Sequence, residues 1–152
     1  MLILRTTLAF LLTSPLTGCS TLPPQIIQDP VAAEALWSLT YHDGSGNGFR
    51  FWKESEGDDA LFEYVPIRPE RSSSGLYSGG EPKKGTLDDE RVKELWQWAR
   101  RLESDASIHV NSRRKGSGAF SLRSSDGVRD FMVKNGPLLR KFNELLVPFR
   151  DD

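Results

Sequence analysis

Nucleophilic catalysis is the first chemistry to consider, because the chain holds His42 beside Asp43 and a serine run, Ser72–Ser74. A Ser-His-Asp site requires these three side chains to converge. Neighbouring residues in a strand point to opposite faces, so adjacency alone does not pair His42 with Asp43. The serine run also lacks the Gly-x-Ser-x-Gly elbow that exposes a nucleophile. We therefore expect a turn histidine and, at His109, a sheet histidine, with no catalytic residue.

A metal or cofactor site is the second possibility. Carboxylates gather between Glu54 and Asp59, but they lack the alternation and the distal bidentate glutamate of an EF-hand loop. A solvated turn is the favoured interpretation. Zinc-binding spacings are absent, and no Lys-Ser/Thr pair follows the glycine-rich stretch Gly44–Gly48 as a phosphate-binding loop requires. The sequence predicts no metal ion and no other cofactor.

The segment 68–85 is the strongest candidate for a binding site. A connection of this length without regular structure is uncommon in a small domain, and is usually functional or disordered. One interpretation is a mobile loop that Leu76 holds to the core. The other is a recognition loop anchored by Tyr77, because tyrosine offers contact area and a hydroxyl at low entropic cost. The candidate partner-binding residues are Arg71, Ser72, Ser73, Ser74, Leu76, Tyr77 and Ser78.

A run of three cations, Arg113, Arg114 and Lys115, precedes a glycine-rich stretch. Consecutive cations on such a loop could bind phosphate or an acidic polysaccharide. The alternative is a solvated turn that discourages aggregation of a sheet edge. The whole chain has 20 basic and 21 acidic residues, a balance that gives no electrostatic field for nucleic acid binding.

The N-terminal segment has the composition of an export signal. Arg5 is its only charged residue, and an apolar run begins at Leu8 that is far shorter than the ~20 residues of a transmembrane helix. The run ends in Leu16-Thr17-Gly18-Cys19, which contains the only cysteine of the chain and resembles the lipobox of bacterial lipoproteins. The alternatives are a short membrane anchor and an ordinary cleaved secretory signal.

The resemblance implies that residues 1–18 are a signal peptide and that Cys19 is the lipid attachment site. Diacylglycerol on its sulfur and an acyl chain such as palmitate on its α-amine would hold the protein stably on a membrane. The implied location is the cell envelope. Aspartate at the second mature position tends to retain lipoproteins of Gram-negative bacteria at the inner membrane. Ser20 therefore implies the outer membrane, facing the periplasm, if the host is Gram-negative.

The remaining chain divides into a tether and one domain. The Pro-rich segment 19–34 favours extended conformations, as a spacer between membrane and domain would. Residues 35–152 have the length of a single ordinary domain. Alternating apolar residues and turn signals within it predict strands. The predicted strands are 36–41, 49–53, 60–65, 106–111, 118–125 and 128–134.

The last two predicted strands form the clearest hairpin, because Asp126-Gly127 between them is a favoured two-residue turn. Pairing outward from that turn gives apolar pairs on one face and an ion pair on the other. The expected pairs are Leu122 with Phe131, Phe120 with Val133, and Arg123 with Asp130.

Two helices complete the prediction. Residues 87–104 carry an apolar stripe at helical spacing, with Thr86 as N-cap and Asp89 in capping-box position. A second amphipathic helix starts at Pro137 and frays at Pro148. The expected order is βββαβββα. Hairpin-linked strands predict an antiparallel sheet of about six strands covered by the two helices, which is a two-layer α+β fold.

These observations favour a non-enzymatic envelope module that binds an unknown envelope protein or glycan through the 68–85 loop. An inhibitor of an exported protease or another envelope enzyme is the alternative, because a rigid sheet presenting one exposed loop suits that role. A hydrolase ranks last, since no convergent set of titratable groups is apparent.

Overall fold

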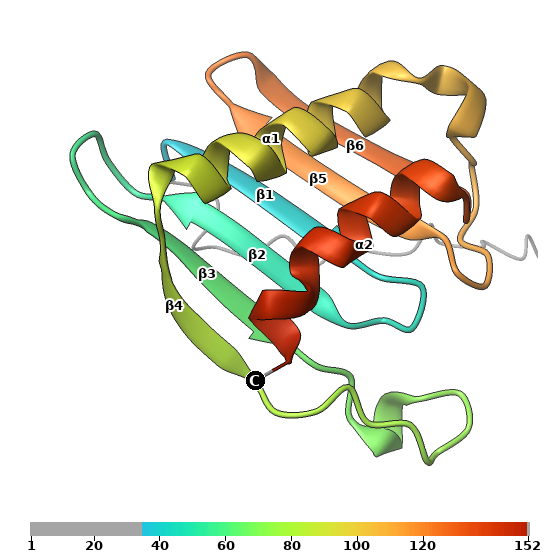
Figure 1. Ribbon diagram of the computed structural model, residues 1–152. Helices are drawn as coiled ribbons and strands as arrows, with labels where there is room; N and C mark the ends of the chain where they lie inside the picture. Colours follow the sequence, from blue (N-terminus) through green and yellow to red (C-terminus); the bar gives the residue numbers. More distant parts are fainter. Residues whose placement is uncertain (1–34, 152) are drawn as a thin grey trace, which may run out of the picture.

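The structure is a computed structural model that describes residues 35–151, and Cys19 and the tether lie outside them. One antiparallel six-stranded sheet forms the framework, with strand order β4-β3-β2-β1-β5-β6. All neighbouring strands are antiparallel, and β1 pairs with β5 although β2, β3, β4 and a helix lie between them in the chain (Figure 1). The strands are β1 (Trp37–His42), β2 (Gly48–Lys53), β3 (Ala60–Val65), β4 (Lys83–Leu87), β5 (Gly118–Ser124) and β6 (Gly127–Val133).

Two amphipathic helices, α1 (Asp89–Ser104) and α2 (Pro137–Arg150), cover one face of this sheet (Figure 1). The predicted α+β class, with an antiparallel sheet of six strands and two covering helices, is confirmed. Two short 3-10 turns, η2 (Pro69–Arg71) and η3 (Ala106–Ile108), lie in the connections. No helix of residues 35–151 combines the length and the apolar character needed to cross a bilayer.

The core lies between the sheet and the helices. Side chains alternate along a strand, so every second residue of the central strands faces α1 and α2. The predicted inward positions of β1 and β2 are confirmed, since Leu39 pairs with Phe51 and Tyr41 with Phe49. Burial of each such side chain contributes about 1.5–3 kcal/mol to folding. The helices contribute the buried residues Leu95, Ala99, Leu102, Leu139, Phe142, Leu146 and Phe149.

The segment 106–111 differs from the extended strand expected for it. Asp105 caps a 3-10 turn there, because its carboxylate accepts hydrogen bonds from the backbone N–H and the hydroxyl of Ser107. Only an isolated bridge, His109 with Val133, follows the turn. The sixth strand of the sheet is instead β4, which pairs with β3 before α1 begins, so residues 83–85 of the expected 68–85 loop are strand.

The register of the β5–β6 hairpin also differs from the expected pairing, by two residues. Phe120 lies opposite Phe131, and Arg123 lies opposite Val128 instead of Asp130. A turn with Asp126 and Gly127 at both central positions would require positive φ at each. Among the described residues only glycines have positive φ, and Gly127 (φ +106°) opens β6, as in a type I turn followed by a bulge.

Both helix starts have clear local causes. The N-cap of α1 is Asp88, whose carboxylate accepts the N–H of Arg91 at 2.7 Å, whereas the predicted cap, Thr86, lies within β4. The predicted start of α2 at Pro137 is confirmed, and Pro148 lies in its last turn. Proline suits the first helical position because its missing N–H is not needed there.

Candidate functional site

The base of the 68–85 loop is built around Asn47, which is fully buried at the end of the β1–β2 connection. Its Oδ1 accepts the backbone N–H of Ile67 at 3.0 Å. Its Nδ2 donates to Asp43 Oδ2 at 2.7 Å and to the hydroxyl of Tyr77 at 3.0 Å. These bonds join the β1–β2 connection to both arms of the loop. We call this set, Asp43, Asn47, Ile67 and Tyr77, the Asn47 network.

The carboxylate of Asp43 is engaged in holding the β1–β2 connection. Its Oδ1 accepts the backbone N–H groups of Ser45 at 2.8 Å, Gly46 at 2.8 Å and Asn47 at 2.9 Å. Together with the bond from Asn47 Nδ2, these donors occupy both carboxylate oxygens. Asp43 therefore holds the glycine-rich turn in shape through its carboxylate, and it does not orient His42.

His42 ends β1, on the face of the sheet opposite Tyr41. Burial lowers the pKa of His42 from its ordinary value, and the nearby charges of Arg113 and Arg50 lower it further. The serine run is engaged within its own loop: Ser72 Oγ donates to the carbonyl of Pro69, and Ser74 Oγ accepts the N–H of Leu76. Among residues 35–151 no hydrogen bond joins the serines to His42, so this arrangement does not resemble a nucleophile–base pair.

A second set of contacts holds the C-terminal arm of the loop. The N–H of Gly79 donates to the carbonyl of Ile67 at 3.0 Å, and the hydroxyl of Tyr64 donates to the carbonyl of Gly79 at 2.5 Å. A Cβ at Gly79 would lie 2.0 Å from Asn47 Oδ1, so the close approach requires glycine. Burial, with the nearby Tyr77 and Asp43, raises the pKa of Tyr64 to about 12.

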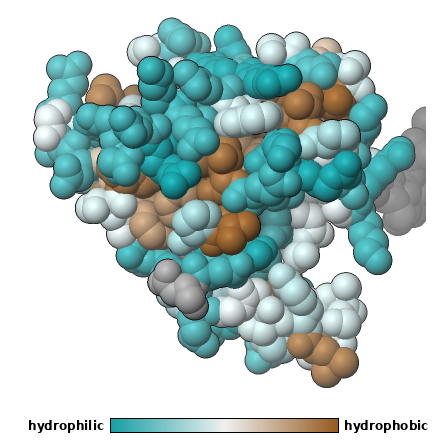
Figure 2. Space-filling model, in the orientation of Figure 1, coloured by the Kyte–Doolittle hydropathy of each residue, from teal (hydrophilic) through white to brown (hydrophobic). Residues whose placement is uncertain are grey.

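The outer part of the loop is exposed. Leu76 is 86% exposed and Tyr77 is 41% exposed. Leu76 therefore does not hold the loop to the core, and that interpretation is wrong; the hydroxyl of Tyr77 makes the contact instead. Figure 2 shows hydrophobic colour at the outer end of this connection, away from the rest of the domain. Ser72 is half-buried, and the other candidate residues are exposed: Arg71, Ser73, Ser74 and Ser78.

The three cations of the 113–115 run have separate surroundings. Arg113 Nη2 donates to the backbone carbonyl of Asp43 at 2.7 Å, which fastens this run to the β1–β2 connection. The backbone N–H and carbonyl of Arg114 both bond Ser117 Oγ and close a tight turn. Lys115 is exposed and lines a pocket. Residues 113–115 therefore form a turn held by hydrogen bonds, and Lys115 is the cation of this run that lines the pocket.

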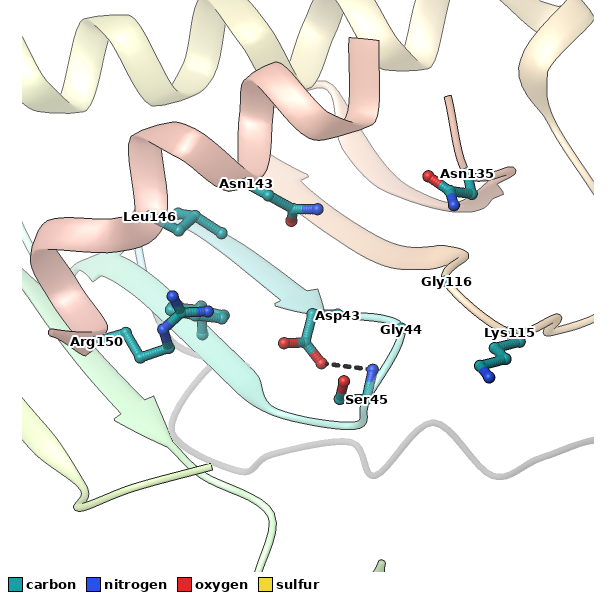
Figure 3. Close-up of a pocket in the computed structure, with 10 residues that line it drawn as sticks. Asp43, Gly44, Ser45, Lys115, Gly116, Asn135, Asn143, Leu146 and Arg150 are labelled. Atoms are coloured by element: carbon teal, nitrogen blue, oxygen red, sulfur yellow. Dashed lines mark hydrogen bonds between the residues drawn. The ribbon is translucent and has the colours of Figure 1, made fainter. Parts of the chain in front are cut away.

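That pocket has a volume of about 360 Å³. It lies where the β1–β2 connection, the 113–116 turn and α2 meet (Figure 3). A Cβ on Gly44 would lie 2.4 Å from the Cα of Gly116, so glycine is required where the two turns cross. The lining residues are Asp43, Gly44, Ser45, Phe49, Lys115, Gly116, Asn135, Asn143, Leu146 and Arg150.

Sequence reasoning found Lys115 but missed the rest of this pocket. Asn143 and Arg150 lie on the predicted second helix, where their spacing signals only the polar side of an amphipathic pattern. Asn143 accepts a hydrogen bond from the hydroxyl of Tyr41 at 2.6 Å, and this contact spans 102 positions of the chain. A contact between residues so distant in sequence leaves no local signal.

Among residues 35–151 no group of three or more His, Cys, Asp and Glu side chains is arranged to hold a metal ion. Comparison with protein-family models, with curated proteins and with solved structures gives no match.

Proposed function

We propose that this chain is a lipid-anchored, non-enzymatic binding module of the cell envelope, which contacts an envelope protein or glycan through the 68–85 loop. The observation that carries the proposal is the contrast within this loop. Its base is fixed by the hydrogen bonds of the buried Asn47, while Leu76 and the ring of Tyr77 are presented to solvent. Binding residues are disproportionately carried by loops that a rigid scaffold positions.

A fixed base favours binding because less freedom is lost when the partner docks. Tyr77 suits the role of an anchor, since its hydroxyl is already bonded to Asn47 and only its ring is left to bury against a partner. Leu76 adds an aliphatic side chain next to it that has no packing role in the domain. The charged side chains of Glu70 and Arg71, both in η2, supply a polar rim.

The anchoring part of the proposal rests on the lipobox-like sequence that ends in Cys19. Palmitate labelling in a bacterial host, with Cys19→Ala as the matched control, tests it. Labelled wild type beside unlabelled Cys19→Ala supports lipid attachment. If the wild type takes no label, or if Cys19→Ala takes as much, the lipid anchor is wrong, and the argument for the envelope location that rests on it fails too.

The loop is tested by placing a photo-crosslinking amino acid at position 76 of the full chain in intact envelope. We expect a discrete adduct that Tyr77→Ala weakens. The control carries the same amino acid at Val128, an apolar residue of β6 that is 44% exposed. An equal pattern of adducts from both positions would contradict a partner site in the 68–85 loop.

The same observation supports one alternative, an inhibitor of an exported protease. A loop with a fixed base and an exposed tip can enter an enzyme cleft without being ordered first. In that case the adduct from position 76 contains a protease, and the purified chain abolishes its activity at equal concentration. Leu76→Ser and Tyr77→Ala would then relieve inhibition, which a module with a non-enzymatic partner does not predict.

A further inference from the structure

We propose that the pocket between α2 and the two crossing turns binds an acidic saccharide, a pyranose that carries a carboxylate. This pocket is formed by residues other than those of the 68–85 loop, so the two proposals stand or fall separately. Its volume of about 360 Å³ lies within the ~300–1,000 Å³ of small-ligand sites.

The cations set the charge of the ligand. Figure 3 shows Arg150 at one end of the pocket and Lys115 at the other. Arg150 is oriented by a bidentate pair with the exposed Asp151, at 2.9 and 3.0 Å, which engages its Nε and Nη2. Asp43 is the single anion of the lining, and its carboxylate oxygens already accept four hydrogen-bond donors. Because Arg150 is paired with Asp151, Lys115 is the cation of the lining that favours a ligand with a carboxylate.

The groups between the cations suit hydroxyls. Asn143 uses its Oδ1 to accept from Tyr41, and within residues 35–151 its Nδ2 has no acceptor. The side chain of Asn135 likewise makes no hydrogen bond within that part of the chain, and Ser45 adds a hydroxyl. Amides and hydroxyls both donate and accept, which is the pattern that sugar hydroxyls require.

The apolar part of the pocket lining favours a sugar over a simple anion. Phe49 is 3% exposed and Leu146 is 2% exposed, yet both line the pocket. The carbon-bound hydrogens of a pyranose can pack on the edges of Phe49 and Leu146 that reach the pocket, whereas inorganic phosphate has no apolar surface to bury there.

The test uses the full-length chain in a Cys19→Ala background, labelled with ¹⁵N, and titrates it with trigalacturonate. The neutral counterpart, a galactose trisaccharide with the same linkage, differs only in its carboxylates, and inorganic phosphate is the third probe. We expect trigalacturonate alone to shift the amide signals of Gly44, Ser45, Gly116 and Asn143. Equal shifts with the neutral sugar, equal shifts with phosphate, or no shift at these residues would overturn the proposal.

Two variants sharpen the result. Asn143→Asp keeps the acceptor for Tyr41 but replaces the donor with an anion, and should weaken binding by about tenfold or more. Lys115→Gln removes an exposed charge without disturbing the core, and should weaken binding by roughly threefold to tenfold. Lys141→Gln is the control, because Lys141 lies on the same helix but pairs with Glu144 outside the pocket. Affinity that falls equally in all three variants would contradict binding in this pocket.

Discussion

The base and the tip of the 68–85 loop belong to the same connection but differ in which kind of side chain is buried and which is exposed. At the base, Asn47 is fully buried and each of its side-chain atoms capable of hydrogen bonding has a partner. At the tip, Leu76 is almost completely exposed and has no packing role. A polar residue is thus inside and an apolar residue outside, which reverses the usual distribution.

This reversal indicates how a small domain can keep a long connection ordered. A buried amide that bonds three separate segments fixes their relative positions, because each bond lost would leave a buried polar group unsatisfied. The tip is then free to carry residues chosen for contact instead of packing. The comparison predicts that stability depends on the base and binding on the tip.

The largest expected effect is at Asn47. Asn47→Ala removes bonds to Asp43, Ile67 and Tyr77 and leaves partly buried groups unpaired, so the free energy of unfolding should fall by about 2–4 kcal/mol. Urea denaturation measures it. Asn111→Ala, at an exposed asparagine, is the control and should change stability by less than about 0.5 kcal/mol. Similar values for the two variants would remove the distinction between base and tip.

The second effect is a loss of stability in alkali. The pKa of Tyr64 is raised from 10.0 to about 12 by burial, so the folded state holds this proton more tightly than the unfolded chain does. Stability from this group is complete below about pH 10 and is lost as the pH rises toward about 12. Unfolding midpoints measured across this interval should fall, and Tyr64→Phe should make the fall shallower. Tyr41, whose pKa burial also raises, keeps a residual slope in that variant.

The smallest effect on stability is expected at the tip. Leu76→Ser should change the free energy of unfolding by less than about 0.5 kcal/mol, because the side chain is 86% exposed. The same variant should weaken the partner contact that the crosslinking experiment detects. A large destabilisation would mean that Leu76 packs on the domain. Stability would then depend on the tip as well as on the base.

The sequence predicts the sheet and the helices well where the pattern is periodic. The alternation around Leu39 and Phe51 and the apolar stripe of α2 each locate an element and its buried face. β4 escapes prediction because Lys83, Lys84 and Gly85 show no apolar alternation, and only Leu87 at its end is buried. The hairpin register is missed because one glycine, Gly127, decides between two turn types.

The site is predicted less completely than the fold. The 68–85 loop is visible in the sequence from its length and composition, but the role of Asn47 is not. Asn47 contacts Ile67 and Tyr77, which lie 20 and 30 positions away, and the sequence offers only an asparagine in a glycine-rich turn. The pocket of Lys115 and Asn143 depends in the same way on contacts between distant segments.

The position of β1 has a mechanical consequence. It is the first strand of the described chain, yet it lies in the middle of the sheet, with β2 on one side and β5 on the other. Tension applied at Ala35, along the axis of β1, would shear two hydrogen-bonded ladders at once instead of peeling an edge strand one bond at a time. If the domain were held at this end and pulled by a partner at the 68–85 loop, both hydrogen-bonded ladders of β1 would bear the force.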